Sequence, residues 1–290
     1  MNISGATIIR NGVKLGFPFI EAIRSVLPLC DEFIVAVGDS QDETRKQIQA
    51  LADPRIRIID TVWDMSRRTG GKVLSEETNK AIAECKGDWV FYIQSDEAVH
   101  EHEYTTIRGA LKRAQERPDI DGIAFNYFHF YGSYSTVQAG RNWYRQEVRL
   151  VRNHCGIRSH GDAQGFRRGN KKIRAINSGA HVYHYGWARP PQVMIEKIKS
   201  FHQLWHDDSW IEENCKSSQS EDYFRDLGNL VPFTGTHPSV MSRVAATGFE
   251  QFIINCRDHY LKKRSLKQAL RDFLRLTPLG EHRNFTLVRG

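Results

Sequence analysis

The amino-acid sequence predicts an α/β fold, in which a mostly parallel central sheet is flanked by helices and followed by a helical extension. Short apolar runs alternate with amphipathic segments through the first hundred residues. The runs are bounded by glycine or polar residues, as is typical of strands buried on both faces. Beyond residue 190 helical spacing replaces these runs. Strands that alternate with helices form parallel sheets, because each helix carries the chain back to the same edge.

The elements of the first hundred residues follow from this pattern. The predicted strands are 6–9, 33–37, 55–59 and 89–93, and the predicted helices lie near 19–27, 42–51 and 75–85. Phe19, Ile23 and Val26 share one face of the first helix, and Pro28 marks its end. Ser75 is the expected N-cap of the third helix.

The composition of the chain indicates a globular protein and argues against a membrane-spanning, secreted or disulfide-rich one. The chain has 290 residues, 40% hydrophobic and 26% charged, which suits a large globular domain with an appendage. No apolar stretch approaches the roughly 18 residues of a membrane span, and the first residues lack the pattern of a secretion signal. Five scattered cysteines without C-x-x-C spacing argue against a disulfide framework and a zinc knuckle. We therefore expect a cytoplasmic protein with reduced thiols.

Polar side chains follow the predicted strands, at the edge where ligands bind in parallel sheets. Arg10-Asn11 follows the first strand, residues 38–42 follow the second, and residues 94–97 follow the fourth. Neither G-x-G-x-x-G nor G-x-x-x-x-G-K-[ST] occurs in the chain. The sequence thus favours a ligand site at this edge, but excludes a dinucleotide fingerprint and a P-loop.

The order of these motifs resembles the family 2 glycosyltransferases of the GT-A fold, which use nucleotide-diphosphate sugars. The likeness rests on Arg10-Asn11, on Ser40-x-Asp42-x-Thr44 and on Asp96-Glu97, and it covers roughly residues 1–190. It implies a GT-A domain with a donor half (1–100) and an acceptor half (101–190), followed by a helical extension (191–290) packed on it. It also implies transfer of a sugar, with UDP-sugar as the expected donor, to a glycan or lipid-linked hydroxyl with inversion.

The resemblance also implies roles for residues on the donor side. Asp96 matches the carboxylate that binds Mg²⁺ or Mn²⁺ between the two phosphates, and Gln94 stands where the family has its first aspartate. Asp39 is the candidate for the contact with the base, whose identity stays open. The full set of expected donor-binding residues is Arg10, Asn11, Asp39, Asp42, Lys72, Asn79, Gln94 and Asp96.

The chemistry of a departing diphosphate requires positive charge, which a cation on a carboxylate and basic side chains supply. Arg67, Arg68 and Lys72 lie in a glycine-containing segment between the third strand and the next helix. These three side chains either meet the phosphates or form a solvated loop. Asp96 itself either holds the cation or caps a helix.

The acceptor half offers candidates for the general base. Residues 122–131 form an aromatic strand whose rings belong to the core or stack on an acceptor sugar. Residues 147–152 alternate as another strand, followed by a polar, glycine-flanked loop at 159–165. Family 2 enzymes place an acceptor-side carboxylate in this region, which implies that Asp162 is the base. Glu147 is the second candidate and His160 the third.

One histidine late in the domain is a candidate metal ligand. In the predicted strand 180–186, His181 and Tyr183 share one face and Val182 and His184 the other. Metal-dependent GT-A enzymes often have a second metal ligand in this region, and His184 resembles it. The alternative is a structural histidine. His202 and His206, one helical turn apart, give only a weak zinc signal.

The C-terminal part is basic. Residues 257–275 hold seven Lys or Arg against Asp258 and Asp272, which is +5 of the chain's formal +7. Such a helix binds the anionic inner face of a membrane peripherally or packs on the catalytic domain.

The sequence therefore predicts a metal-assisted glycosyltransferase of polysaccharide biosynthesis. Two alternatives remain: a catalytically silent nucleotide- or sugar-binding relative, which Gln94 makes plausible, and a basic nucleic-acid-binding protein. No nucleic-acid-binding motif occurs, so nucleic acid is not an expected partner.

Overall fold

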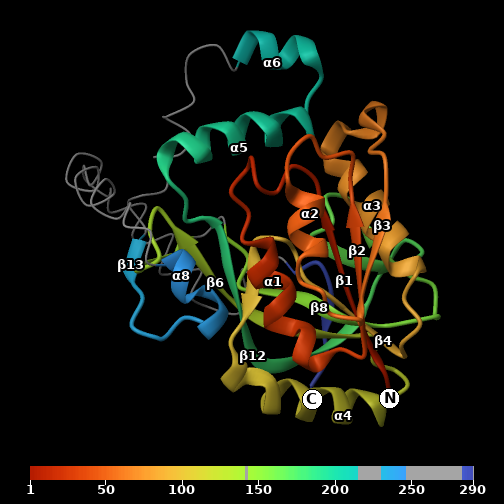
Figure 1. Cartoon of the computed structure of the whole chain (residues 1–290). Coiled ribbons are helices and arrows are strands. Elements are labelled where there is room, and N and C mark those ends of the chain that lie inside the picture. The colour runs from red at the N-terminus through yellow and green to blue at the C-terminus, as the bar shows by residue number, and fades with distance from the viewer. Residues whose placement is uncertain (141–142, 215–229, 246–282, 290) are drawn as a thin grey trace, which may run out of the picture.

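The computed structural model describes residues 1–140, 143–214, 230–245 and 283–289, and one large mixed sheet runs through them (Figure 1). The strands of its main path, from edge to edge, are β3 (Ile56–Asp60), β2 (Glu32–Val37), β1 (Ile3–Ile9), β4 (Trp89–Tyr92), β8 (Gln146–Arg152), β6 (Gly122–Tyr131), β7 (Thr136–Gln138) and β13 (Leu230–Pro232). β12 (Arg174–Trp187) pairs with β6, with β5 (Glu97–Val99) and with β14 (Thr286–Leu287). The predicted α/β class is confirmed.

The four N-terminal strands are parallel, as the sequence predicted. β1 pairs with β2 from Ser4 opposite Glu32 to Ile9 opposite Val37, and its other edge pairs with β4. β8 then runs antiparallel to both β4 and β6. The carboxyl ends of β1, β2 and β4 therefore meet at one edge of the sheet, next to strands of the second half.

Helices cover both faces of this sheet. Their bounds are α1 (Phe19–Val26), α2 (Thr44–Gln49), α3 (Lys72–Ala83), α4 (Tyr104–Gln115), α5 (Pro191–Gln203), α6 (Asp208–Asn214) and α8 (Ser242–Ala245). The core has one layer with buried residues of α1 and α4 and another with buried residues of α3. Alternate residues of β2 enter the two layers, with Phe33 in the first and Ile34 in the second. This two-sided burial explains the uninterrupted apolar runs.

The start of α3 differs from the prediction. The helix begins at Lys72, its N-cap is Gly71 with φ of 71°, and Ser75 lies inside the helix. The Ser75 hydroxyl donates to the carbonyl of Lys72 at 2.9 Å instead of capping the helix. An ideal Cβ on Gly71 would lie 2.9 Å from Cβ of Asp162, so a tertiary contact and a left-handed backbone fix this helix start.

The second half adds a small sheet of its own. β9 (Ile157–His160), β10 (Gly165–Arg168) and β11 (Lys171–Lys172) pair antiparallel in the order β11-β10-β9. The turn between β9 and β10 contains Asp162, with left-handed backbone at Gly161 and Ala163. The predicted loop 159–165 is therefore the tip of a β-hairpin.

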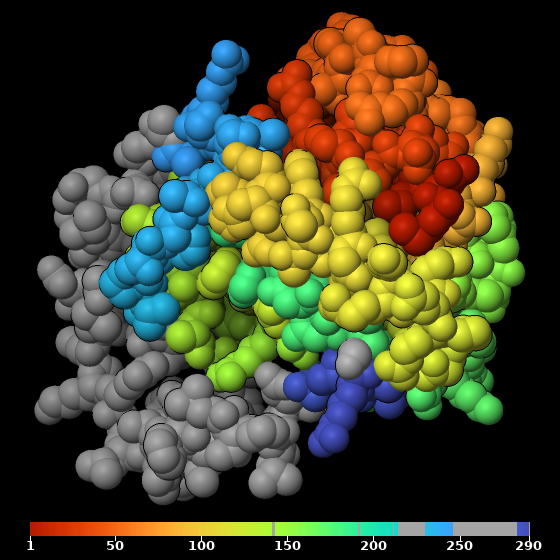
Figure 2. Space-filling model, turned by 90° about the horizontal axis from the view of Figure 1, so that it is seen from below, coloured from red at the N-terminus to blue at the C-terminus, as the bar shows by residue number. Residues whose placement is uncertain are grey.

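The predicted helical extension after residue 190 contains helices α5, α6 and α8 and also two short strands that the sequence did not predict. β13 adds an edge strand beside β7, and β14 pairs in parallel with the start of β12. Two- and three-residue strands have too little sequence for a periodic pattern, so pairing alone reveals them. Figure 2 shows the C-terminal segment 283–289 beside α4, and the guanidinium of Arg117 donates to the carbonyl of Arg289 there.

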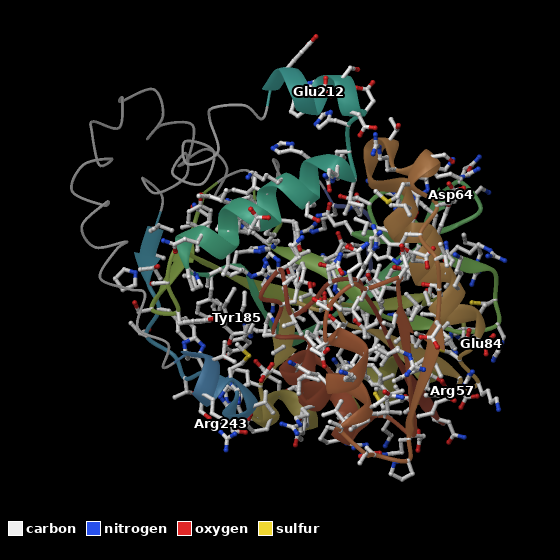
Figure 3. All side chains as sticks on the ribbon, turned by 45° about the horizontal axis from the view of Figure 1, so that its top comes forward. Arg57, Asp64, Glu84, Tyr185, Glu212 and Arg243 are labelled. Atoms are coloured by element: carbon white, nitrogen blue, oxygen red, sulfur yellow. The ribbon has the colours of Figure 1, made fainter. Side chains whose placement is uncertain are left out.

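The basic segment 257–275 lies outside the described residues, so its membrane contact stays a prediction. In the described part of the chain, no helix has the length and apolar character needed to cross a membrane. Exposed ion pairs join elements at the surface, such as Arg57 of β3 with Glu84 beyond α3 at 2.7 Å (Figure 3). Pairs of this kind contribute little to stability.

Candidate functional site

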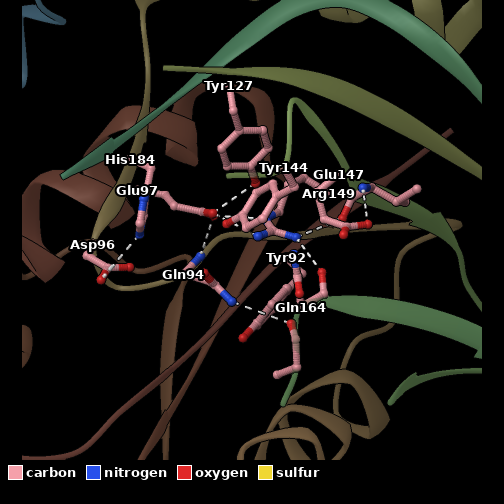
Figure 4. Close-up of polar contacts among 12 residues, drawn as sticks. Tyr92, Gln94, Asp96, Glu97, Tyr127, Tyr144, Glu147, Arg149, Gln164 and His184 are labelled. Atoms are coloured by element: carbon pink, nitrogen blue, oxygen red, sulfur yellow. Dashed lines mark hydrogen bonds and ion pairs between the residues drawn. The ribbon is translucent and has the colours of Figure 1, made fainter. Parts of the chain in front are cut away.

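Asp96 lies at the carboxyl edge of the sheet, four residues after the end of β4. Its backbone carbonyl accepts a hydrogen bond from the amide of Tyr185 at 2.7 Å, which ties it to β12. The side chain is 7% exposed, and its Oδ2 lies 3.7 Å from Nε2 of His184 (Figure 4). The structure therefore brings together the two residues that the sequence proposed as metal ligands. Instead of capping a helix, Asp96 precedes the short strand β5.

Two basic side chains surround the same carboxylate. Nζ of Lys197, from α5, is 3.1 Å from Oδ2 of Asp96, and the buried guanidinium of Arg189 is 3.7 Å from it. Burial alone raises the pKa of the Asp96 carboxyl, but the charge of Lys197, with further contributions from His184 and Arg189, holds it well below its usual range. Burial, and next the charge of Arg189, lower the pKa of Lys197 to about 7.

The lysine reaches this position because α5 lies across the end of the sheet opposite to the two chain termini (Figure 1). Met194 and Ile198 of α5 are buried, and Lys197 lies on the same side of the helix. The Asp96 carboxylate is negative, and the guanidinium of Arg189 and the protonated ammonium of Lys197 are positive, so the centre around Asp96 has a net positive charge when Lys197 is protonated. Such a centre attracts a polyanion.

The carboxylate of Glu97, next to Asp96 in the sequence, is bound by other side chains of the protein. It forms a buried two-pronged ion pair with Arg149 of β8, with both N–O distances 2.8 Å. The Tyr127 hydroxyl and the backbone N–H of Gln94 also donate to its carboxylate, at 2.8 and 3.0 Å. Four donors satisfy Glu97, so it supports the loop that carries Asp96.

The remaining predicted donor-side residues lie after β1 and β2. Arg10 forms an ion pair with Asp39 at 3.0 Å, and its guanidinium lies over the Trp63 ring, 5.7 Å from the centroid. Asn11 accepts from the amide of Gln41, and Asp42 accepts from the amide of Lys14. Asn11 and Asp42 therefore hold the two loops together, while Arg10 and Asp39 line the edge.

The three other residues predicted to bind the donor, Asn79, Lys72 and Gln94, have different surroundings. Both groups of the Asn79 amide bind the backbone of Ser159, at 3.0 and 2.8 Å. Lys72 is exposed at the start of α3. Gln94 donates through Nε2 to the carbonyl of Ala163 at 3.4 Å. Asn79 and Gln94 thus attach the β9–β10 hairpin to the edge of the main sheet.

The basic segment before α3 is held by ion pairs. Arg67 pairs with Glu76 at 2.7 Å, and Arg68 pairs with Asp208 of α6 at 2.8 Å. The amide of Gly71 donates to the carbonyl of Leu204 at 3.0 Å. This segment is therefore joined to the α5–α6 region and is more than a solvated loop.

Asp162 lies at the tip of the hairpin, whose backbone contacts the loop that carries Asp96. Its Oδ1 accepts from the amide of Gln164 at 3.2 Å, and the next two residues contact Gln94 and Arg149 through their carbonyls. The side chain is half-buried, and His160 is exposed. Asp162 is thus close in the structure to the loop that carries Asp96, although 66 residues separate them in the sequence.

Glu147 is enclosed in the sheet. It is 1% exposed, and Asn284 and the amide of Val148 donate to it at 2.9 and 3.0 Å. In Figure 4 it lies on the other side of the Glu97–Arg149 pair from Asp96. Burial raises the pKa of the Glu147 carboxyl to about 6. These surroundings suit an internal polar group better than a base exposed to an acceptor.

Replacing Glu147 with glutamine should stabilise the protein at pH 8. Because folding raises this pKa from 4.5 to about 6, the charged form is disfavoured in the folded state. The wild-type protein therefore loses stability as the pH rises from about 4.5 to 6, and the loss persists above pH 6. The shift corresponds to about 2 kcal/mol.

Thermal unfolding of wild type and Glu147→Gln at pH 5 and pH 8 measures this effect. The variant should gain most at pH 8. A variant that is less stable than wild type at pH 8 but not at pH 5 would show that the negative charge is needed in the fold.

The backbone at residue 186 approaches Asp96 and His184 so closely that only glycine fits there. An ideal Cβ on Gly186 would lie 2.4 Å from Nε2 of His184 and 2.7 Å from Oδ2 of Asp96. Two ligands that share one cation, each about 2.1 Å from it, are separated by about 3 to 4 Å. The observed 3.7 Å between the two atoms lies in the range for two ligands of one divalent cation. The ammonium of Lys197 would then share Oδ2 of Asp96 with that cation.

No group of three His, Cys, Asp or Glu side chains is arranged for metal binding in the residues that the structure describes. Mg²⁺-type sites in phosphate-binding proteins commonly have one or two protein ligands, and substrate phosphates and water complete the coordination. The Asp96–His184 pair corresponds to that kind of site.

Sequence reasoning missed three residues of this site: Arg149, Arg189 and Lys197. Two of them carried a signal. Lys197 interrupts the apolar stripe of its helix, and Arg149 occupies a buried position of an alternating strand. Charge at a core position indicates a buried partner.

Comparison with known proteins gives a family for the chain. The model described as "Glycosyl transferase family 2" matches residues 18–174, which is more than half of the 290 residues. No curated protein matches the sequence.

The comparison with solved structures finds, among others, two proteins. S. aureus TarS 1-349 has a TM-score of 0.39 and 12% identity, with 79% of this chain and 80% of that chain covered. Glucosyl-3-phosphoglycerate synthase from Mycobacterium tuberculosis, in complex with Mn²⁺, UDP and glucosyl-3-phosphoglycerate, has a TM-score of 0.31 and 20% identity, with 45% of each chain covered.

Proposed function

Since the chain belongs to glycosyl transferase family 2, we propose that it transfers a sugar, with inversion, from a nucleotide-diphosphate donor to a hydroxyl of a glycan or lipid-linked acceptor. UDP-sugar is the proposed donor. The observation that carries the proposal is the buried Asp96 carboxylate, with His184, Lys197 and Arg189 around it at the carboxyl edge of the sheet.

Each side chain of this centre has a distinct task in the proposal. Asp96 and His184 hold Mn²⁺ or Mg²⁺, which supplies Lewis-acid stabilisation of the departing diphosphate when bound. Lys197 and Arg189 place positive charge beside the same phosphates. Glu97 and Arg149 keep the Asp96 loop in place through their buried pair. In this proposal the donor half (1–100) binds the nucleotide, His184, Arg189 and Lys197 from later in the chain complete the diphosphate site, and residues 101–190 present the acceptor.

Asp162 is the proposed general base. Its half-buried carboxylate lies at a hairpin tip that is joined to Gln94, close to the edge where the donor would lie. An inverting displacement needs a base on the side of the sugar opposite to the diphosphate. Glu147 is less suited, because it is enclosed and bound by Asn284.

A thermal-shift panel of nucleoside diphosphates, with and without Mn²⁺, tests the proposal. A ligand present at 100 times its Kd stabilises the folded protein by about 2.7 kcal/mol. We expect the largest increase in Tm with UDP and Mn²⁺ together. A panel in which no nucleotide raises Tm would refute the donor assignment.

A catalytically silent relative is the alternative, and Gln94 is the observation that favours it. Its amide binds the hairpin at Ala163 where the family has a carboxylate. Detectable turnover with any nucleotide sugar excludes this alternative.

Replacing Gly186 with alanine should weaken the proposed cation site. The new methyl group would occupy the space between His184 Nε2 and Asp96 Oδ2. Mn²⁺ affinity in the presence of UDP should therefore fall at least about 10-fold, as measured by titration calorimetry.

Gly109→Ala is the matched control. Its Cβ would meet only an Arg113 side-chain atom at 3.7 Å on helix α4, so Mn²⁺ affinity should be unchanged. A folded Gly186→Ala protein with wild-type Mn²⁺ affinity would exclude this location of the cation.

A further inference from the structure

A second histidine, His129, lies directly behind His184. The two residues are paired in the parallel register of β6 and β12, so their side chains lie on the same face of the sheet. His129 is 3% exposed and His184 8%. Their Nδ1 atoms are 2.9 Å apart, which is a hydrogen bond between the rings.

The other nitrogen of His129 fixes the direction of this hydrogen bond. Nε2 of His129 is 2.7 Å from the backbone carbonyl of Tyr144, and a carbonyl oxygen only accepts, so Nε2 carries a proton. A second proton on Nδ1 would make the buried ring cationic, although its two nitrogens contact only a carbonyl and another imidazole. Burial of a charge without a counter-ion in contact is costly. His129 Nδ1 is therefore the acceptor, and His184 Nδ1 is the donor.

This direction determines which nitrogen of His184 is left for the site. With Nδ1 donating to His129, Nε2 is the atom that faces Asp96 Oδ2 at 3.7 Å, beyond hydrogen-bond distance. Histidines that bind metals commonly donate their other N–H to a fixed acceptor, which sets the ring orientation. That acceptor is usually a carboxylate or a carbonyl, and here it is an imidazole.

We propose that His129 is a positioning residue, which accepts the Nδ1 proton of His184 and thereby presents Nε2 of His184 to the divalent cation beside Asp96. This inference rests on the proposed function. The chain of contacts runs from the Tyr144 carbonyl through His129 to His184, so the segment before β8 contributes to the site through His129.

Two substitutions separate the acceptor role from a structural role. Asparagine places an oxygen near the position of Nδ1, so His129→Asn keeps an acceptor for His184 and loses the donor to Tyr144. Glutamine reaches one atom further, so His129→Gln keeps a donor for Tyr144 and loses the acceptor for His184. The two variants are similar in polarity, and each loses one of the two hydrogen bonds.

Mn²⁺ affinity in the presence of UDP, measured by calorimetry on the full chain, is the readout. We expect His129→Gln to lose about 10- to 100-fold in affinity, the range for groups that orient metal ligands, and His129→Asn to stay near wild type. Equal affinities in the two variants, or a greater loss in His129→Asn, would overturn the proposal. Tm of each variant reports the structural effect separately.

Two controls distinguish this proposal from the proposed function. If wild type binds no Mn²⁺ with UDP, the function fails. If wild type binds Mn²⁺ and His184→Ala does not, but His129→Gln matches wild type, only the role of His129 fails.

If either variant does not fold, long-range ¹H–¹⁵N spectra of wild type with Mg²⁺ and UDP determine the direction of the hydrogen bond between the two histidines. They should show protons on His184 Nδ1 and His129 Nε2, and the reverse pattern would overturn the proposal.

Discussion

Replacing Asp96 with asparagine should lower turnover by about 10³-fold, because the cation at the diphosphate would lose its charged ligand. The Mn²⁺-dependent part of UDP binding should disappear as well. Asparagine has the size of aspartate but no charge, so the loop after β4 keeps its shape. Steady-state kinetics and calorimetry with and without Mn²⁺ measure the two effects.

Stability needs its own control in this experiment. Asp96→Asn leaves Lys197 and Arg189 without the carboxylate at 3.1 and 3.7 Å, and breaking a buried pair costs about 3–5 kcal/mol. The double variant Asp96→Asn/Lys197→Met removes one of the two buried charges and should recover part of that loss. Turnover should remain low in the double variant. A stable double variant with wild-type Mn²⁺ dependence would show that Asp96 does not hold the cation.

Asp162→Asn should lower turnover by about 10²-fold or more with little change in donor affinity. Asparagine retains an oxygen for the amide of Gln164, so the hairpin turn should persist, but it cannot take a proton. A base acts only when the hydroxyl attacks, and its loss therefore lowers kcat more than it changes nucleotide binding. Rate measurements and UDP titrations on the same preparation separate these effects.

The two rival bases provide matched comparisons for Asp162. Glu147→Gln and His160→Asn remove the same capacity at an enclosed and at an exposed position. Both should retain near wild-type turnover. Near wild-type turnover in Asp162→Asn, together with a large loss in one of the other two variants, would reassign the base.

The predictable part of the fold is the part with local patterns. The buried runs of β1, β2 and β4 and the stripe of α1 are periodic over enough residues to be found without tertiary information. The start of α3 was missed because Gly71 adopts a left-handed backbone next to Asp162, which no local rule reveals. The edge strands β13 and β14 were missed because their pairing partners lie far away in the sequence.

The candidate site divides in a similar way. Residues directly after strands, such as Asp39 and Asp96, were found because the carboxyl ends of parallel strands converge in any such sheet. Lys197 comes from a helix that crosses the sheet edge, 101 residues after Asp96, and Arg149 comes from an antiparallel strand. Their charges are informative only once a partner is known to be close.

The sequence by itself determined the α/β class, the parallel half-sheet and the polar edge that includes Asp96, because hydrophobic periodicity and the residues after each strand are local properties. Only the tertiary structure decided what surrounds Asp96. The register of β6 with β12 sets His129 behind His184, and the packing of α5 sets Lys197 beside the carboxylate. A hydrogen bond or an ion pair depends on distances of about 3 Å, and packing between distant segments determines such distances.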